Sequence, residues 1–309
     1  MIATITMNPS IDQNFVVRSL VMDDANRALS VRRTAGGKGL NVSKVLRELG
    51  GPTRAYALAG GFVGDFWKHL VGELGIPFEA SAVGGETRIN TVLTDIGDRT
   101  QTRVSAPGPA VTGADLDGFL KKLLAVRPKP FLWALGGSLP KGAPASTYRS
   151  FVSALQKNGT PCILDADDEA LRQGVKARPF CIKPNEFEMH RLIGKKLGTE
   201  AQYRTAAAAL VRRGVGIVVV SLGAKGALVV SRDRSFRLPG VPVPVKSKVG
   251  AGDSLIGGLA LGLWKKLDLG RAAALGIAAS TSAVMRESPR LCRRSDIAPL
   301  LRKVRIEPY

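Results

Sequence analysis

A chain of 309 residues with 45% hydrophobic content can bury a sizeable core in one large domain or two smaller ones, which argues against an intrinsically disordered protein. The 45 Lys and Arg residues against 25 Asp and Glu give a net charge of +20, which raises nucleic-acid binding as an alternative function. Its basic residues are scattered in pairs and only 6% of the residues are aromatic, which argues against a nucleic-acid ligand that stacks its bases.

The sequence contains no window of about eighteen uninterrupted apolar residues and no basic, then apolar leader at its N-terminus. We therefore expect a cytoplasmic protein with no membrane partner. The three cysteines, Cys162, Cys181 and Cys292, are far apart, and His69 and His190 each stand alone. Neither a disulfide framework nor a zinc site is expected from this spacing.

The first candidate site residue follows a buried strand predicted at residues 2–7. The next five residues, Asn-Pro-Ser-Ile-Asp, read as a turn, so Asp12 falls beyond the carboxyl end of that strand. Ligands collect at this edge of open α/β sheets, although an ordinary turn aspartate is the alternative. Short strand-like runs at 15–17 and 28–31 then predict a hairpin outside the main sheet.

A glycine-rich segment, Thr-Ala-Gly-Gly-Lys-Gly-Leu-Asn, begins at residue 34 and leads into a helix that ends near residue 49. Its glycines permit close approach of the backbone to a ligand, and Lys38 and Asn41 add a charge and an amide at the start of the helix. The order of a nucleotide P-loop is absent. A glycine-rich turn with a solvent-facing lysine is the alternative interpretation.

A second hairpin is predicted between residues 88 and 105, with Arg88 at its base. An arginine there can hold a phosphate with two hydrogen bonds, or simply make a surface ion pair. From residue 131 onward, strands and helices alternate at βαβ spacing, and glycines and polar residues recur where strands end. This layout predicts a mostly parallel sheet with a ligand crevice along one edge.

The most informative stretch is Val-Gly-Ala-Gly-Asp-Ser at residues 249–254, which opens an apolar helix. Glycines let successive N–H groups converge on an anion, and the helix adds the positive end of its dipole. Asp253 is placed to accept a proton from a hydroxyl that attacks phosphorus, although a Gly-x-Gly-Asp turn that simply caps a helix is the alternative. Earlier in the chain, Asn185 and Glu188 have the spacing of a helix capping box.

Seven motifs, taken together and in this order, resemble the PfkB branch of the ribokinase-like carbohydrate kinases over nearly the whole chain. The motifs are Asn8-Pro-Ser-Ile-Asp12, Ala35-Gly-Gly-Lys-Gly-Leu-Asn41, Gly85-Glu-Thr-Arg88, Gly137-Ser-Leu-Pro140, Lys183-Pro-Asn-Glu-Phe-Glu188, Ser221-Leu-Gly-Ala-Lys-Gly226 and Val249-Gly-Ala-Gly-Asp-Ser254. The resemblance implies a three-layer αβα sandwich with a mostly parallel central sheet and a small β lid. It implies one kinase domain over residues 1–309, with lid hairpins inserted at about 13–33 and 88–105.

The resemblance also implies a role for each matched residue. Asp253 would be the general base, beside an anion hole formed by Gly250, Ala251 and Gly252. The sugar hydroxyls would be held by Asp12, Gly37, Asn41 and Ser138, and the phosphate already on the substrate by Arg27, Lys38 and Arg88. The ATP side would be lined by Lys183, Asn185, Ser221, Gly223 and Gly226. Glu188 would act on magnesium through water, which favours a metal role over the capping box.

The function implied is an ATP- and magnesium-dependent phosphofructokinase that converts fructose 1-phosphate or fructose 6-phosphate into fructose 1,6-bisphosphate. A tagatose-6-phosphate kinase of the same family is one alternative, and a non-catalytic, basic nucleic-acid-binding or regulatory protein on a kinase fold is another. A monovalent cation and a homodimer formed through the lid are further expectations. One departure from the family pattern is the run Leu-Asp-Ala-Asp-Asp at residues 164–168. Its extra carboxylates either alter the nucleotide side or cap a helix.

Overall fold

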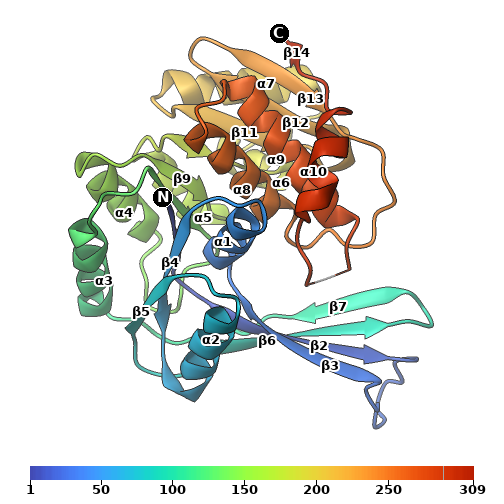
Figure 1. Cartoon of the computed structure of the whole chain (residues 1–309). Helices are drawn as coiled ribbons and strands as arrows, with labels where there is room; N and C mark the ends of the chain where they lie inside the picture. The colour runs from blue at the N-terminus through green and yellow to red at the C-terminus, as the bar shows by residue number, and fades with distance from the viewer. Residues whose placement is uncertain (288) are drawn as a thin grey trace.

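The computed structural model describes residues 1–287 and 289–309, and its centre is a ten-stranded sheet of order β14-β13-β12-β11-β10-β9-β8-β1-β4-β5 (Figure 1). Seven neighbouring strands, β11, β10, β9, β8, β1, β4 and β5, run parallel. Strands β12, β13 and β14 add to the β11 edge by antiparallel pairing. The strands are β1 (Ile2–Thr6), β4 (Thr53–Ala59), β5 (Phe78–Ala82), β8 (Leu132–Gly136), β9 (Cys162–Asp165), β10 (Cys181–Ile182), β11 (Ile217–Ser221), β12 (Gly226–Ser231), β13 (Ser235–Pro239) and β14 (Glu307–Pro308).

Apolar residues fill both faces of this sheet, because helices cover it on both sides. In β11, Val218 and Val220 belong to one buried cluster, whereas Ile217 and Val219 belong to the cluster on the opposite face. The alternation follows from the two-residue period of a strand. The expected α/β class with a mostly parallel sheet is therefore confirmed.

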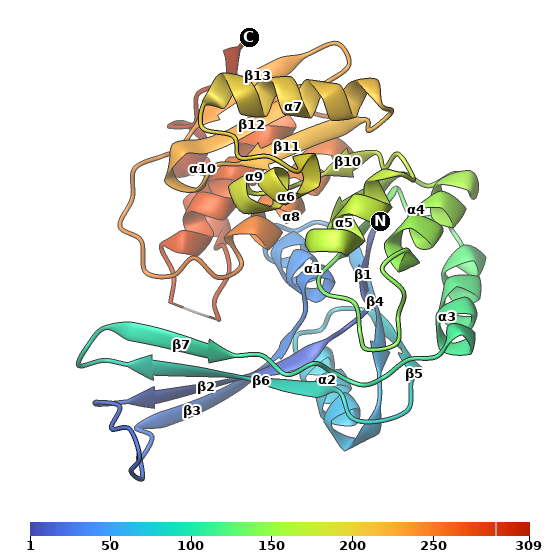
Figure 2. The same cartoon turned by 180° about the vertical axis from the view of Figure 1, so that it is seen from behind.

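The helices form the two outer layers of the sandwich. Helices α3 (Gly113–Ala125), α4 (Thr147–Lys157), α5 (Asp168–Val175), α6 (Glu186–Ile193) and α7 (Glu200–Arg212) lie on one side, in front in Figure 2. Helices α1 (Lys38–Glu48), α2 (Gly61–Glu73), α8 (Ala251–Trp264), α9 (Leu269–Val284) and α10 (Arg294–Leu301) lie on the other. Among the described residues, no helix is long and apolar enough to cross a membrane.

Helix α8 packs tightly against α9. A Cβ atom on Gly258 would lie 2.6 Å from the carbonyl oxygen of Leu275 and 2.8 Å from the Cα of Gly276. Only glycine fits such a close contact between helix backbones. The contact therefore helps to place the first turn of α8, which carries Asp253, at the edge of the sheet.

Four strands form a separate sheet, the lid, of order β3-β2-β6-β7. They are β2 (Ser10–Val17), β3 (Ser30–Gly36), β6 (Arg88–Asp95) and β7 (Thr100–Val104). The lid extends from the base of the main sheet beneath α1 and α8 (Figure 1). Asp12 lies within β2, paired with Asn90 of β6, so the expectation that it sits in a turn is wrong. Strand pairing with β3 and β6 outweighs the turn signal of Asn8 and Pro9.

The two faces of the lid differ in polarity. The strand register places Asp12, Arg88, Asn90 and Arg103 on one face, because their positions differ by even steps along paired strands. The opposite face carries the exposed apolar residues Val31, Ile89 and Val104. The polar face is the one that lines the candidate site described next, and the apolar face points away from it.

Candidate active site

The candidate active site lies where the carboxyl ends of the parallel strands meet the base of the lid. Asp165 is the last residue of β9, Lys183 directly follows β10, and Ser221 is the last residue of β11. These strand ends share one edge of the sheet, and α1 and α8 bring Asn41 and Asp253 to it. The fold therefore gathers residues that are far apart in the sequence.

The first turn of α8 is open to an anion. It follows Gly250, whose φ of 78° lies in the left-handed region that glycine adopts without strain. No side chain of the described residues caps this helix, and the Ala251 N–H makes only a long contact of 3.5 Å with the Lys248 carbonyl. The N–H groups that follow it in the first turn can therefore face an anion. A Cβ on Gly252 would lie 3.2 Å from the Lys183 ammonium, which brings a positive charge to the same turn. The anion hole of Gly250, Ala251 and Gly252 stays a prediction that this geometry permits.

Asp253 lies within this turn and is only 7% exposed. Its Oδ2 accepts a 2.8 Å hydrogen bond from Nδ2 of Asn41. Burial raises the pKa of Asp253 to about 6, and the Asp165 carboxylate adds to the rise, whereas the Asn41 hydrogen bond, Lys38 and Lys183 oppose it. Such a carboxylate is ionised at neutral pH and is a stronger base than an ordinary aspartate.

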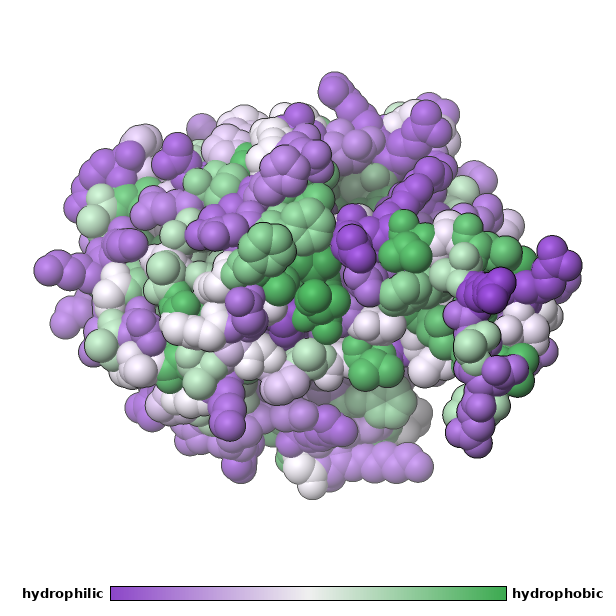
Figure 3. All heavy atoms as spheres, turned by 90° about the horizontal axis from the view of Figure 1, so that it is seen from below, coloured by the Kyte–Doolittle hydropathy of each residue, from purple (hydrophilic) through white to green (hydrophobic). Residues whose placement is uncertain are grey.

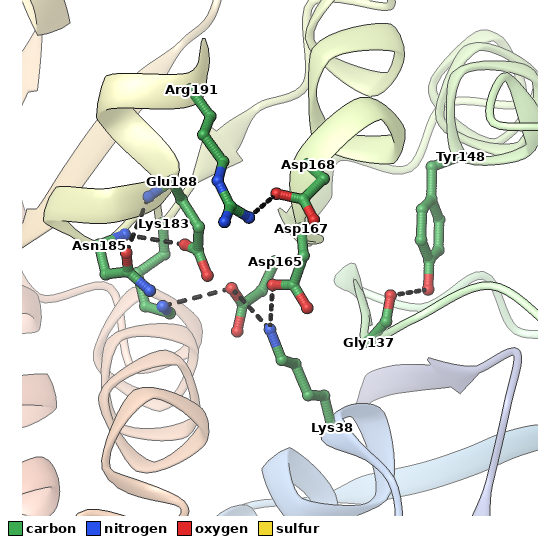
Figure 4. Close-up of polar contacts among 10 residues, drawn as sticks. All are labelled: Lys38, Gly137, Tyr148, Asp165, Asp167, Asp168, Lys183, Asn185, Glu188 and Arg191. Atoms are coloured by element: carbon green, nitrogen blue, oxygen red, sulfur yellow. Dashed lines mark hydrogen bonds and ion pairs between the residues drawn. The ribbon is translucent and has the colours of Figure 1, made fainter. Parts of the chain in front are cut away.

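Two lysines and two aspartates form an ion-pair cluster (Figure 4), and three of these four residues act electrostatically on Asp253. Lys38 Nζ donates to Asp167 Oδ1 at 2.9 Å and lies 3.6 Å from Asp165 Oδ1, while Lys183 Nζ lies 3.2 Å from the same Asp165 oxygen. Burial opposes the charged form of Lys38, but the two aspartates raise its pKa above the ordinary value. Asp165 and Asp167 thus fix the positions of Lys38 and Lys183 at the candidate site.

The structure does not bring together the three cations expected to hold the substrate's phosphate. Lys38 is directed into the ion-pair cluster, and Arg27 lies exposed in the loop between β2 and β3, at the far end of the lid (Figure 1). Arg88 lies at the base of the lid, where its guanidinium donates to the carbonyls of Asn8 and Ala106. The sequence motifs could not show this separation, because side-chain direction and loop position depend on long-range packing.

Arg88 nevertheless has the properties of an anion-binding group. Its Nε is buried and has no hydrogen-bond partner among the described residues. Burial lowers the pKa of Arg88, the nearby Asp12 opposes that change, and the neighbouring Arg103 adds to it. Two guanidinium groups that repel each other, one with an unused donor, are an arrangement that an anion would stabilise.

Asn185 and Glu188 form the capping box that the resemblance had argued against. The Asn185 side chain accepts from the Glu188 N–H at 2.9 Å, and Glu188 Oε2 accepts from the Asn185 N–H at 2.8 Å. Burial nevertheless raises the pKa of Glu188 to about 7; Lys183 opposes the rise and Asp165 adds to it. Capping is thus observed, whereas the magnesium role of Glu188 stays a prediction.

The remaining residues assigned to ATP lie along the same edge. Ser221 N donates to the Pro184 carbonyl at 2.9 Å, which joins the segment after β10 to the end of β11. Gly223 begins a single 3₁₀ turn, η1 (Gly223–Lys225), and Gly226 begins β12. This turn connects two antiparallel strands next to the candidate site, and its role toward ATP stays a prediction.

A small cavity of about 90 Å³ lies between the lid and helix α1. The residues that line it include Asp12, Asn14, Asn41, Lys44 and Arg103. Asp12 Oδ1 accepts hydrogen bonds from Ser10 and Asn90, both at 2.9 Å. Of these five residues, the sequence motifs predicted Asp12 and Asn41 and missed the other three. The signals that could have found them are the two-residue alternation from Asp12 and the helical spacing from Asn41.

Two residues expected to hold sugar hydroxyls lie at the margins of this arrangement. Gly37 is the N-cap of α1, directly after β3. Ser138 Oγ accepts from the Asn8 side chain at 3.3 Å, beside the carbonyl that Arg88 contacts. The contacts of Gly37 and Ser138 with a sugar stay predictions.

A magnesium ion fits this site only together with nucleotide phosphates. No group of three or more metal-ligating side chains occurs among the described residues. Magnesium is commonly held by one or two carboxylates plus substrate phosphates and water, so a full protein cage is not required. Glu188 supplies a carboxylate of the kind this mode needs, whereas Oδ1 of Asp165 is already ion-paired with Lys183 and Lys38.

Comparisons with known proteins agree with this geometry. The family model described as pfkB family carbohydrate kinase matches residues 5–296. The 1-phosphofructokinase of Escherichia coli strain K12 is 34% identical over 313 residues, covering 100% of this chain and 98% of that protein. The ATP-dependent 6-phosphofructokinase isozyme 2 of Mycobacterium tuberculosis strain H37Rv is 32% identical over 297 residues, covering 96% and 87%.

The solved structures include phosphofructokinase-2 from Escherichia coli in complex with potassium, with a TM-score of 0.94, 29% identity and 98% of each chain covered. The same enzyme in complex with fructose-6-phosphate and in a tetrameric inhibited form aligns with TM-scores of 0.91 and 0.92, again at 29% identity and 98% coverage of each chain. These likenesses extend over nearly the whole chain, including the lid.

Proposed function

Because this chain belongs to the pfkB family of carbohydrate kinases, we propose that it transfers the γ-phosphoryl group of ATP to a fructose phosphate. The product would be fructose 1,6-bisphosphate. The expected ribokinase-like fold is confirmed by the structural likeness to phosphofructokinase-2. The position of the phosphate on the acceptor is left to experiment, since relatives of both kinds are similar to the chain at 34% and 32% identity.

The observation that carries this proposal is the environment of Asp253. A buried carboxylate with a raised pKa lies in an uncapped helix turn and shares a hydrogen bond with Asn41, which lines the cavity under the lid. In the proposed reaction, Asp253 accepts the proton of the attacking hydroxyl. The N–H groups of the same turn then stabilise negative charge on the transferred phosphoryl group.

The polar face of the lid supports an acceptor that already carries a phosphate. Arg88 has a buried Nε without a partner, and Arg103 lies close enough to lower the pKa of Arg88. We assign the acceptor's phosphate to these two arginines, and its hydroxyls to Asp12, Asn41 and the neighbouring Ser138. An uncharged sugar would leave the repulsion between the guanidinium groups uncompensated.

The ATP phosphates are assigned to the edge formed by Lys183, Asn185 and Ser221. Lys38 pairs with Asp167, and its charge also acts on Asp253. We propose that Lys38 meets the phosphoryl group in transit, and that Glu188 holds magnesium through water. Bound magnesium would neutralise charge on the phosphate oxygens and orient them for in-line transfer.

The test is a panel of acceptors measured with Mg²⁺ and ATP: fructose 1-phosphate, fructose 6-phosphate, tagatose 6-phosphate and unphosphorylated fructose. We expect kcat/KM to be highest for one of the two fructose phosphates and at least 10²-fold lower for fructose. Preferred turnover of tagatose 6-phosphate would support the alternative within the family. Turnover of fructose alone would refute the assignment of Arg88 and Arg103. No turnover, with salt-sensitive binding of nucleic acid, would support the non-catalytic alternative.

We also propose that two copies of the chain associate through the apolar face of the lid. Val31, Ile89 and Val104 are exposed on it, and Figure 3 shows apolar residues between charged ones on the side of the molecule where the lid lies. One structural relative is described as tetrameric. Light scattering should give a dimer for the wild type and a monomer for Val104→Glu. Turnover in K⁺ compared with Na⁺ tests the expected monovalent-cation effect.

A further inference from the structure

We infer that Lys44 is a positioning residue for the proposed base: its ammonium holds the side-chain amide of Asn41 so that the amide NH₂ is directed at Asp253. This inference rests on the proposed function, in which Asp253 accepts the proton. Neither the sequence motifs nor the family resemblance pointed to Lys44, which lies on α1 one turn after Asn41.

The chain of contacts is short and continuous. Lys44 Nζ lies 3.3 Å from Asn41 Oδ1 and also donates to the backbone carbonyl of Ala35. The other end of the same amide, Asn41 Nδ2, donates to Asp253 Oδ2 at 2.8 Å. A single side-chain amide thus connects a lysine on one side with the carboxylate on the other.

The chemistry of these groups permits only one orientation of the amide. A lysine ammonium can only donate hydrogen bonds, and an ionised carboxylate can only accept them. Asn41 therefore satisfies both neighbours when its oxygen faces Lys44 and its NH₂ faces Asp253. If the amide turned by 180°, its oxygen would face the carboxylate and its NH₂ would face the ammonium, and both hydrogen bonds would be lost.

The anchoring of Lys44 supports this role. Its second contact is the carbonyl of Ala35, a buried residue near the end of the lid strand β3, so the ammonium is held by two acceptors. Lys44 also lines the cavity under the lid together with Asn41. The Lys44 ammonium is consequently a fixed donor beside the amide, and α1 keeps the two residues in register across one turn.

The expected effect follows from the groups that face Asp253 and Lys44. Asp165 on β9, Lys38 on α1 and Lys183 after β10 act on Asp253 in addition to Asn41. Asp12 and Asp253 act on Lys44, whose pKa burial lowers to about 8. The charged residues that line the adjoining cavities with Lys44 are Arg32, Arg33, Arg47, Glu48, Glu73, Arg103 and Arg290. Removing Lys44 leaves all of these in place and frees the Asn41 amide to rotate.

The experiment compares Lys44→Met, Lys44→Arg and the matched control Arg47→Met, which removes a positive charge from the same helix. The readout is the midpoint of the acid limb in kcat/KM for the preferred sugar phosphate. Lys44→Met should raise that midpoint by about one pH unit, the scale of a lost hydrogen bond to a charged group. Lys44→Arg, which keeps a donor, should restore it, and Arg47→Met should not move it.

A double-variant cycle separates positioning from a direct effect of charge. If Lys44 acts through the amide, adding Lys44→Met to Asn41→Ala should leave the midpoint of Asn41→Ala unchanged. Additive shifts in the double variant would overturn the inference, as would a wild-type midpoint in Lys44→Met. Lys44→Ala, which leaves room for water, has the same expected shift and is used if Lys44→Met does not fold.

A measurement that needs no turnover keeps this inference separate from the proposed function. The Asp253 carboxyl carbon can be titrated by ¹³C NMR in aspartate-labelled protein, with Asp253→Asn identifying its signal. The titration midpoint should rise in Lys44→Met whether or not any sugar phosphate is a substrate. An unchanged titration would refute the role of Lys44, whereas a shifted one without kinase activity would refute only the proposed function.

Discussion

Replacing Asp253 with asparagine should lower activity and raise stability at the same time. The asparagine oxygen can still accept the hydrogen bond from Asn41, so the contact at 2.8 Å is retained while the proton acceptor is lost. Removal of a positioned general base costs about 10²-fold to 10⁴-fold in rate. We therefore expect kcat of Asp253→Asn to fall at least 10²-fold, with KM for ATP close to the wild-type value.

The gain in stability follows from the raised pKa of Asp253. Because the value rises from 3.8 to about 6 on folding, the folded protein binds this proton more tightly than the unfolded chain does. The stability contributed by the protonated form is present below pH 3.8 and is lost as pH rises through 6. Above pH 6 the buried carboxylate therefore costs about 3 kcal/mol, which asparagine removes.

Two assays on the same preparations test both effects. An ADP-release assay at pH 8 measures turnover, and thermal unfolding at pH 8 and pH 5 measures stability, with a rise on the order of 5 °C expected at pH 8 and a smaller one at pH 5. Asp117→Asn, on the exposed face of α3, is the control and should change neither quantity. Undiminished turnover in Asp253→Asn, or a lower unfolding temperature at pH 8, would refute the reasoning.

Three further predictions test other parts of the site. In the wild type, kcat/KM should rise with pH around a midpoint near 6 as Asp253 ionises, and a flat profile from pH 5 to 7.5 would contradict its role. Arg88→Met should raise KM for the sugar phosphate about 10-fold to 100-fold without changing KM for ATP, whereas equal increases would argue against a phosphate contact. Asn185→Ala should lower the free energy of unfolding in urea by about 1 kcal/mol, because it removes the cap of α6. Ser146→Ala is its control, since the Ser146 side chain makes no capping bond, and an equal loss there would show that the cap is not the cause.

Some features of the site are local and can be predicted from neighbouring residues alone. The glycine before the helix at residue 251, the carboxylate in its first turn and the apolar face that follows all depend on short-range backbone preferences. The parallel sheet is likewise indicated by alternating strand and helix patterns. These features can be predicted without knowing which segments meet in space, and the family resemblance depends on them.

Other features depend on contacts between distant segments. Lys38 pairs with Asp167, 129 positions away, which directs it into the ion-pair cluster instead of toward Arg88. Arg103 reaches the polar face of the lid only because β7 pairs with β6 in one particular register.

The amino-acid sequence by itself therefore determined which chemical groups the protein carries, and the order of its strands, helices and glycine turns. The tertiary structure alone decided which charges face one another, the pKa of Asp253 and the contact from Lys44 to Asn41. The physical reason is that strand register, burial and side-chain direction depend on packing between residues far apart in the chain, whereas turns and helix starts depend on adjacent ones.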